Sequence, residues 1–470
     1  MQPVSPHEVP VSRVIAKFAS DMRFERLPVA FVDFLKDHIV DVVGTSLAAT
    51  RFDFAYRALA GLGTLADGSG GTVIGMPQRL PLKDAALMNG VLAHGLDYDD
   101  THPVGPVHPS SSAFPCVLAV GEHIDCNGRD LLLAYALGIE IATRLGLAAN
   151  GTMHKIGFHT TGVVGHPACA VAAGKLLSLN ADQLANAQGL AGSTASAIAE
   201  HRKDGAWNKR IHPGWAAVGG MTGASLARAG FIGTKKVYEG GDGLFRTHAG
   251  SHVGDIDFDA ITASLGECWR AEEVAVKPYP VCHILHACID SAIALRTEHE
   301  LKPADIAGVR VLLHPDTFHY VCENPEMRRR PTSDYMAKFS AHYTTAAALI
   351  RGKCGFAELE PDAIGDPAIL ALAQRVEHAP DPKSAFPEYF SGGVEVTLAN
   401  GRTVAHHDRV NRGAGERALD RREIAQKFLD NAAFAMSESR AEEMLDALLG
   451  IERLSGREIA KAVSAGASAR

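Results

Sequence analysis

The spacing of apolar residues over the first half of the chain constrains the fold more than any other feature. Between residues 28 and 49 apolar side chains recur at the period of about 3.6 residues that a helix requires. The same spacing predicts further helices over residues 83–96, 130–147, 160–177 and 181–199. The last of these is rich in Gly, Ala and Ser, and small residues at helical spacing let helix backbones approach closely. Because 46% of all residues are hydrophobic, we expect a packed core of buried helices rather than a disordered chain.

The pattern changes near residue 270, where short strand-like segments begin to alternate with helices. Residues 394–398 are followed by Asn400-Gly401 and a second short apolar segment, which is typical of a β-hairpin with a type I′ turn. Towards the C-terminus the helical spacing returns. The sequence therefore predicts a mainly α fold, in which a large all-helical domain is built from both chain ends and a smaller α+β lid domain is inserted. The expected bounds are 1–269 and 405–470 for the helical domain and 270–404 for the lid.

Charge and cysteine content exclude several classes of function. The chain has 46 Lys and Arg against 54 Asp and Glu, a net charge of −8, so it lacks the basic surface that general nucleic-acid binding requires. None of the eight cysteines forms a Cys-x-x-Cys pair, the usual mark of zinc ribbons and iron–sulfur sites. The N-terminal residues lack the apolar core of a signal peptide, and no segment is expected to span a membrane. We expect a cytoplasmic protein with reduced, mostly buried thiols.

The densest polar constellation runs from His94 to His108, at the end of a predicted helix. It holds Asp97, Asp99 and Asp100, followed by Thr101 and His102. Close carboxylates raise one another's pKa and histidine titrates near neutrality, so one interpretation is a proton-transfer site. A site for a divalent metal ion, through Asp97, Asp99 and His108, is a second, and a solvated acidic helix end is a third.

Three basic clusters also lie at element ends. The first is His154-Lys155 with His159-Thr160-Thr161, the second is His201-Arg202-Lys203 with Lys209-Arg210 and His212, and the third spans residues 277–286. Each alone is typical of a solvated surface or a helix cap. Three of them in an acidic chain suggest that they converge on a ligand that carries carboxylates.

These same segments resemble the MmgE/PrpD family, which includes 2-methylcitrate dehydratase, cis-aconitate decarboxylase and iminodisuccinate epimerase. The matching segments occur in the family's order over most of the chain. They are Ala85-Ala86-Leu87-Met88-Asn89-Gly90, His94-x-x-Asp97-Tyr98-Asp99-Asp100-Thr101-His102, His108-Pro109-Ser110, Gly157-Phe158-His159-Thr160-Thr161, Lys209-x-x-His212-x-Gly214, Lys277-Pro278-Tyr279-Pro280-x-Cys282-His283-x-x-His286 and Ala337-Lys338-Phe339-Ser340.

The resemblance implies a homodimer of two-domain chains with an active site between the helical domain and the lid, and a small di- or tricarboxylic acid as substrate. It implies no cofactor, no metal, no nucleic acid and no membrane as partner. The residues expected to be catalytic are Asp97, His108, His159 and Lys209. Those expected to bind substrate are Thr101, His102, Lys277, Cys282, His283 and His286.

The family's reactions break a C–H or C–C bond next to a carboxylate, which requires a positioned base and nearby cations. Our first hypothesis is a cofactor-independent dehydratase in which His108 or His159 moves the proton. Asp97 orients the histidine or acts as the partner acid or base, and Lys209 and Lys277 neutralise carboxylates. Alternatives are an epimerase of an imino- or amino-dicarboxylate and a decarboxylase of the cis-aconitate type. Cys282 stands where the decarboxylase-like members have a histidine, which favours the first hypothesis over the last. A protein that keeps the fold without catalysis is the remaining alternative.

Overall fold

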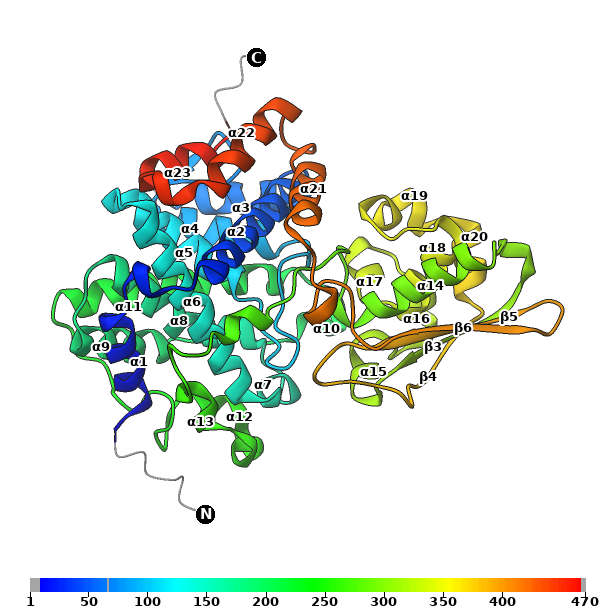
Figure 1. The fold of residues 1–470 in the computed structure, drawn as a ribbon, viewed down its shortest axis with the longest axis horizontal. Coiled ribbons are helices and arrows are strands. Elements are labelled where there is room, and N and C mark those ends of the chain that lie inside the picture. Colours follow the sequence, from blue (N-terminus) through cyan, green and yellow to red (C-terminus); the bar gives the residue numbers. More distant parts are fainter. Residues whose placement is uncertain (1–8, 66, 466–470) are drawn as a thin grey trace. The chain divides into compact units, whose positions relative to one another are not determined.

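A computed structural model describes residues 9–65 and 67–465, and the chain divides into two compact units. Unit 1 comprises the chain up to Val274 together with the segment from Asp420 onward, and unit 2 is Ala275–Leu419. The expected boundary at about 405 falls inside a strand, β6 (Thr403–Asp408), and the pairing of β6 with its neighbour keeps it in unit 2. Unit 1 is helical and unit 2 combines helices with a small sheet, so the predicted mainly α fold is confirmed (Figure 1).

Unit 1 is built from helices that come from both ends of the chain. Its N-terminal helices are α1 (Val11–Asp21), α2 (Val29–Ala49), α3 (Asp53–Gly63), α4 (Leu82–His94), α5 (Ser110–Ile124), α6 (Gly128–Ala149), α7 (Thr152–Lys155), α8 (Thr160–Leu176), α9 (Ala181–Gly192), α10 (His201–Asp204), α11 (Asn208–Arg228), α12 (Leu244–Ala249) and α13 (Phe258–Thr262). Its C-terminal helices are α21 (Arg421–Ala432), α22 (Glu438–Leu449) and α23 (Gly456–Val463). Helices α21 and α22 pack on α2, and α23 packs on α5, where orange and red ribbons lie beside blue and cyan ones in Figure 1. A two-stranded sheet joins β1 (Gly71–Thr72) to β2 (Arg79–Leu80).

The centre of unit 1 depends on close contact between helices, as the small residues predict. Helix α11 packs on α4, α8 and α9. A Cβ atom at Gly90 of α4 would lie 2.3 Å from the Cα atom of Gly214 in α11, so the two backbones touch there. This contact holds the C-terminal end of α4 beside the N-terminal half of α11.

One helix of unit 1, α6, is long and apolar enough to cross a membrane, but its most apolar window is 94% buried inside the fold, as in a core helix. This finding is in line with the expectation that no segment spans a membrane. Tryptophan side chains are large and mostly apolar, so the three tryptophans of unit 1 are expected in its core. Trp269 lies there, whereas Trp207 and Trp215 are 42% and 50% exposed.

Unit 2 holds a four-stranded sheet in the order β4-β3-β5-β6. Its strands are β3 (Ile306–Leu313), β4 (Val376–Pro380), β5 (Gly392–Leu398) and β6. The hairpin predicted at Asn400-Gly401 is confirmed, since β5 and β6 pair antiparallel. Its predicted type I′ turn is wrong, because that type requires a positive φ at both central residues and only Gly401 (85°) has one, whereas Asn400 does not. The helices are α14 (His286–Glu298), α15 (Phe318–Val321), α16 (Pro325–Arg329), α17 (Asp334–Lys338), α18 (Ala341–Arg351), α19 (Pro361–Ile364) and α20 (Pro367–Ala373).

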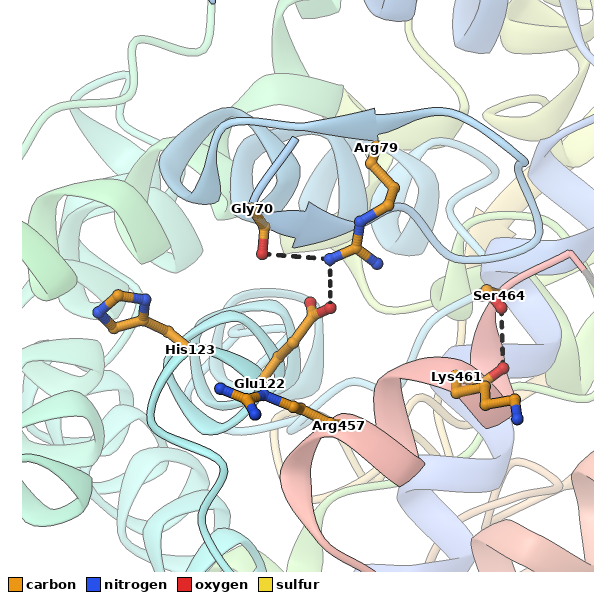
Figure 2. A pocket seen from close by; sticks show the side chains of 7 residues that line it. All are labelled: Gly70, Arg79, Glu122, His123, Arg457, Lys461 and Ser464. Atoms are coloured by element: carbon orange, nitrogen blue, oxygen red, sulfur yellow. Dashed lines mark hydrogen bonds and ion pairs between the residues drawn. The ribbon is translucent and has the colours of Figure 1, made fainter. Parts of the chain in front are cut away.

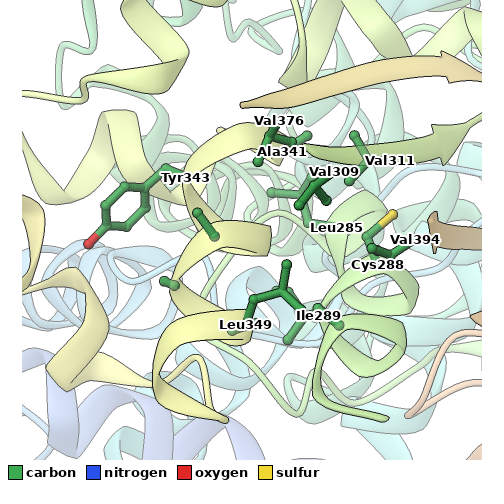
Figure 3. Close-up of a cluster of buried hydrophobic side chains, with 14 of the residues drawn as sticks. Leu285, Cys288, Ile289, Val309, Val311, Ala341, Tyr343, Leu349, Val376 and Val394 are labelled. Carbon is green, nitrogen blue, oxygen red and sulfur yellow. The ribbon is translucent and has the colours of Figure 1, made fainter. Parts of the chain in front are cut away.

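Helices α14 and α18 supply the apolar cover of this sheet. Figure 3 shows Leu285, Cys288 and Ile289 meeting Val309 and Val311 of β3 in one buried cluster. Unit 2 therefore has its own hydrophobic core, as an inserted domain must have in order to fold within a longer chain.

Candidate active site

The segment that follows α4 returns as a buried loop whose carboxylates are each held by a specific partner. Asp97 has a positive φ of 54°, which is uncommon for a residue other than glycine and marks a backbone held in place by its surroundings. Its carboxylate forms a very short ion pair with the Lys209 ammonium from α11. Both side chains are buried, with exposed fractions of 4% and 12%. The close contact of α4 with α11 through Gly90 brings these two groups together.

His108 has a tautomer that its neighbours determine. Its Nδ1 atom lies 2.8 Å from the carbonyl oxygen of Asp100 and 3.0 Å from the hydroxyl of Thr101. A carbonyl can only accept, so Nδ1 carries the proton and donates to Asp100. The lone pair of the neutral imidazole is then on Nε2, and the Thr101 hydroxyl keeps its own proton to donate elsewhere.

Asp100 anchors this arrangement from behind. Its carboxylate accepts from His38 Nδ1–H at 2.9 Å, from the backbone N–H of Ser110 at 3.2 Å and, over a very short distance, from the Ser110 hydroxyl. Tyr135 extends this series of hydrogen bonds by donating to Ser110 Oγ at 2.5 Å. All of these side chains are buried, so the backbone carbonyl that holds His108 belongs to a rigid, fully hydrogen-bonded residue.

Three histidines meet beside this loop: His94, His108 and His159. Each offers one nitrogen, and these nitrogens lie within 4.8 Å of one another. The ring centroids are 4.7 Å apart for His94 and His108 and 5.3 Å apart for His94 and His159. His94 donates from Nδ1 to Asp99 at 2.7 Å, which also places its lone pair on Nε2.

His159 continues the cluster towards α11, because its Nδ1 atom shares a hydrogen bond of 3.1 Å with Nδ1 of His212. Burial lowers the pKa of His159 well below its usual value, with the Lys209 charge as the next cause. The same two effects lower the pKa of His212 to about 4, and burial lowers that of His201 to about 3. His159, His212 and His201 are therefore neutral at pH 7.

His102 has both ring nitrogens engaged by other residues of unit 1. Its Nδ1 atom accepts from the backbone N–H of Gly105 at 3.0 Å, so Nε2 carries the proton and donates to Glu273 at 3.1 Å. The side chain is fully buried, and it holds the loop to the 3-10 turn Arg270–Glu273. The substrate-binding role that we expected for His102 stays a prediction.

The remaining expected residues belong to unit 2. Lys277 is 1% exposed. Cys282 is half-buried, and its backbone N–H donates to the backbone carbonyl of Lys338 at 3.0 Å. Asn411 donates to Nε2 of His283 at 2.7 Å, and His286 donates from Nε2 to the carbonyl of Val281 at 3.2 Å. The two histidine rings are 4.7 Å apart. The roles of these residues towards a substrate stay predictions.

In unit 1 the structure brings together Asp97, Thr101, His108, His159 and Lys209. The sequence indicated no positioning role for the residues that hold them. His94, Asp99, Asp100 and His212 stood in the matched segments, and only Asp99 had a suggested function, as a metal ligand. The fifth, His38, lies in α2 and gave no signal, because only the fold places it beside Asp100.

A cavity of about 450 Å³ lies elsewhere in unit 1, and none of the predicted site residues lines it (Figure 2). Arg79 donates there to Glu122 at 2.6 Å and to the carbonyl of Gly70. Glu122 also accepts from the backbone N–H and the hydroxyl of Thr72, each at 2.8 Å. The pair Arg79–Glu122 thus ties β1 to β2 and α5, which is a structural role.

Comparison with known proteins identifies the family of the chain. A family model described as the MmgE/PrpD N-terminal domain matches residues 13–255, and one described as the MmgE/PrpD C-terminal domain matches residues 279–451. The chain is 30% identical over 436 residues to cis-aconitate decarboxylase of Homo sapiens, covering 89% of this chain and 87% of the relative. It is 29% identical over 435 residues to cis-aconitate decarboxylase of Mus musculus, covering 89% and 86%. The enzyme of that name from Aspergillus terreus (strain NIH 2624 / FGSC A1156) is 26% identical over 464 residues, covering 94% of both chains. The chain therefore belongs to the MmgE/PrpD family.

Proposed function

We propose that this protein is a cofactor-independent lyase that acts next to a carboxylate of a small di- or tricarboxylic acid. The observation that carries the proposal is the fixed tautomer of His108, whose Nδ1–H is bound to the Asp100 carbonyl. Such a histidine presents a basic Nε2 atom in a defined direction, which is what proton abstraction from carbon requires.

The neighbours of His108 have complementary roles in this proposal. The Thr101 hydroxyl donates to a substrate carboxylate, and Lys209 stabilises the negative charge that builds on it in the transition state. Asp97 pairs with Lys209 and so positions the lysine. Asp99 orients a histidine, His94. The role that we expected for Asp97, to orient a histidine or to act as the partner acid or base, stays a prediction.

In the dehydration that the sequence favours, Nε2 of His108 takes the proton from the carbon next to the carboxylate. The C–H electron pair becomes the new C=C bond, the C–O bond of the neighbouring hydroxyl group breaks, and the imidazolium of His108 returns its proton to the departing hydroxide, which leaves as water. The neutral state of His159 fits a second base or a group that accepts a hydrogen bond from the substrate.

Decarboxylation is the second candidate, because the curated relatives described above are named cis-aconitate decarboxylases. In that reaction the bond to the departing CO₂ breaks, its electron pair stays on carbon, and the imidazolium form of His108 supplies a proton to that carbon. Against decarboxylation stands Cys282, at a position where the decarboxylase-like members have a histidine. The neighbouring His283 is a poor substitute for that histidine, since Asn411 already binds its Nε2 atom.

The test is a screen of methylcitrate, citrate, cis-aconitate, iminodisuccinate and tartrate-like acids by proton NMR in deuterated water. Loss of water identifies a dehydratase, and loss of CO₂ identifies a decarboxylase. Deuterium exchange with inversion, without loss of either, identifies an epimerase. His108→Gln should abolish the turnover found, and His123→Gln, a histidine outside the cluster, should keep it. Unchanged turnover in His108→Gln would refute the proposal.

We also propose a homodimer, in line with the family resemblance. Ile211, Trp215 and Leu226 share one face of α11 and are 48%, 50% and 40% exposed, an unusual amount of apolar surface for a central helix. Light scattering should give twice the chain mass for the wild type and the chain mass for Trp215→Glu. A wild-type monomer at assay concentration would contradict this.

A further inference from the structure

We propose that His94, His108 and His159 form a binding site for one divalent transition-metal ion such as Zn²⁺ or Co²⁺, and that an ion bound there inhibits turnover. Their nitrogens already lie within 4.8 Å of one another, and all three side chains are buried. Imidazole is the side chain that such ions bind most often, and three histidines with a water as fourth ligand make a common tetrahedral set.

The second observation is how each ring is held. His94 donates from Nδ1 to a carboxylate, Asp99, and His108 donates from Nδ1 to a backbone carbonyl, that of Asp100. Histidine ligands of metal ions nearly always donate their other ring N–H to a carboxylate or a carbonyl, which fixes the tautomer and strengthens the ligand. The Nδ1–H groups of His94 and His108 thus make the hydrogen bonds that are typical of histidines whose other nitrogen binds a metal ion.

His159 completes the set through His212. Its Nε2 atom is buried and has no hydrogen-bond partner among the described residues. The hydrogen bond between the two Nδ1 atoms allows the proton to lie on His159, with His212 as the acceptor. In that state the lone pair of His159 is on Nε2, the nitrogen that needs a partner.

The charges around the cluster suit a dication. The charge of Lys209 acts on His159, whose pKa it lowers, and Asp97 offsets that charge in an ion pair with Lys209. The carboxylate of Asp99 lies 3.8 Å from His108 as well as bonding to His94. A bound ion therefore gains a buried negative partner. The three histidines differ from the metal ligands suggested by the sequence, which were Asp97, Asp99 and His108.

Inhibition follows from competition for one lone pair. An ion on Nε2 of His108 takes the electron pair that would accept the substrate proton, and an ion on His159 removes the second neutral base. This half of the inference rests on the proposed lyase function, whereas metal binding itself does not.

The experiment titrates chelator-treated full-length protein with Co²⁺, whose visible absorption is intense when it is four-coordinate with histidine ligands. We expect one Co²⁺ per chain, displacement by Zn²⁺, and a rise of the melting temperature with ion concentration, because the ion binds only the folded state. His94→Gln and His159→Gln should lose the absorption. Asp99→Asn should weaken binding by about 10–100-fold, the usual effect of removing an outer hydrogen bond.

His154→Gln is the matched control, because His154 is 6.0 Å from His159 by ring centroids but lies outside the set of three. It should bind Co²⁺ as the wild type does. No absorption in the wild type, or equal absorption in His94→Gln and His159→Gln, overturns the site. Binding of Zn²⁺ without loss of turnover overturns the inhibition alone, and absence of turnover in ion-free protein counts against the lyase function and leaves the binding result intact.

Discussion

Replacing Lys209 by Met tests the buried ion pair on which the proposed chemistry depends. The change leaves the Asp97 carboxylate, 4% exposed, without its cation. Removing one partner of a buried pair typically costs about 3–5 kcal/mol of stability, because an uncompensated charge stays in a medium of low dielectric. We therefore expect Lys209→Met to lower the free energy of unfolding of unit 1 by this amount.

Asp97→Asn combined with Lys209→Met supplies the control. The double variant holds two neutral groups of similar size, so it should recover most of the loss. Denaturant titration followed by tryptophan fluorescence reports on the correct part of the chain, because Trp207, Trp215 and Trp269 all belong to unit 1.

The same variant has a second, independent readout. The charge of Lys209 is the largest cause after burial of the lowered pKa of His159. Its removal should raise that pKa, which NMR titration of the imidazole measures directly. A Lys209→Met protein as stable as the wild type, or a double variant less stable than either single one, would refute the reasoning about the pair.

Three further predictions concern the support of the site. His38→Leu removes a hydrogen-bond donor to the buried Asp100 carboxylate. We expect the free energy of unfolding, measured by chemical denaturation, to fall by about 1.5–3 kcal/mol, and kcat to fall with KM unchanged. An unchanged kcat would show that Asp100 does not act through His108. Gly90→Ala places a Cβ atom against the Gly214 backbone and should cost about 1–3 kcal/mol, whereas Gly241→Ala, where a Cβ atom meets nothing, should have little effect. The pKa of His212 is about 4 in the folded chain and 6.5 in a free histidine, so between these values the unfolded chain binds a proton that the folded chain excludes. His212 alone should therefore contribute a fall of up to about 1.4 kcal/mol per pH unit in the free energy of unfolding as the pH drops through this window. His212→Asn should reduce the measured slope by this contribution, and an equal slope in the variant would contradict the assignment.

The helical part of the fold could be predicted because its signals are local. The apolar spacing over residues 28–49 and 83–96 matches α2 and α4 within two residues at each end. The helix predicted over residues 181–199 ends at Gly192, because the Gly-Ser-Thr sequence that follows offers little helical preference. The exposure of Trp215 could not be predicted, since burial depends on what the fold places opposite a helix face.

The candidate site shows the same limit more sharply. Residue types and family resemblance selected the segment from Asp97 to His108, where the chemistry is dense. They could not tell which carboxylate serves which base, because Asp97, Asp99 and Asp100 stand within four residues and are chemically alike. Only the fold shows that one pairs with Lys209, one with His94 and one with His38.

This division of partners has a chemical consequence. A lone carboxylate beside a histidine would raise its pKa and favour the protonated form. Here Asp97 is bound to Lys209 instead, and burial together with the lysine charge keeps His159 neutral. A neutral imidazole such as that of His159 can accept a proton from carbon, and the nearby Lys209 can stabilise the charge that the lost proton leaves behind. A substrate carboxylate that approaches Lys209 competes with Asp97 for its ammonium group, so the charge felt by His159 depends on substrate binding. The sites of cation and base are thus coupled, and the coupling predicts that substrate analogues with a carboxylate alter the titration of His159 in the wild type but not in Lys209→Met.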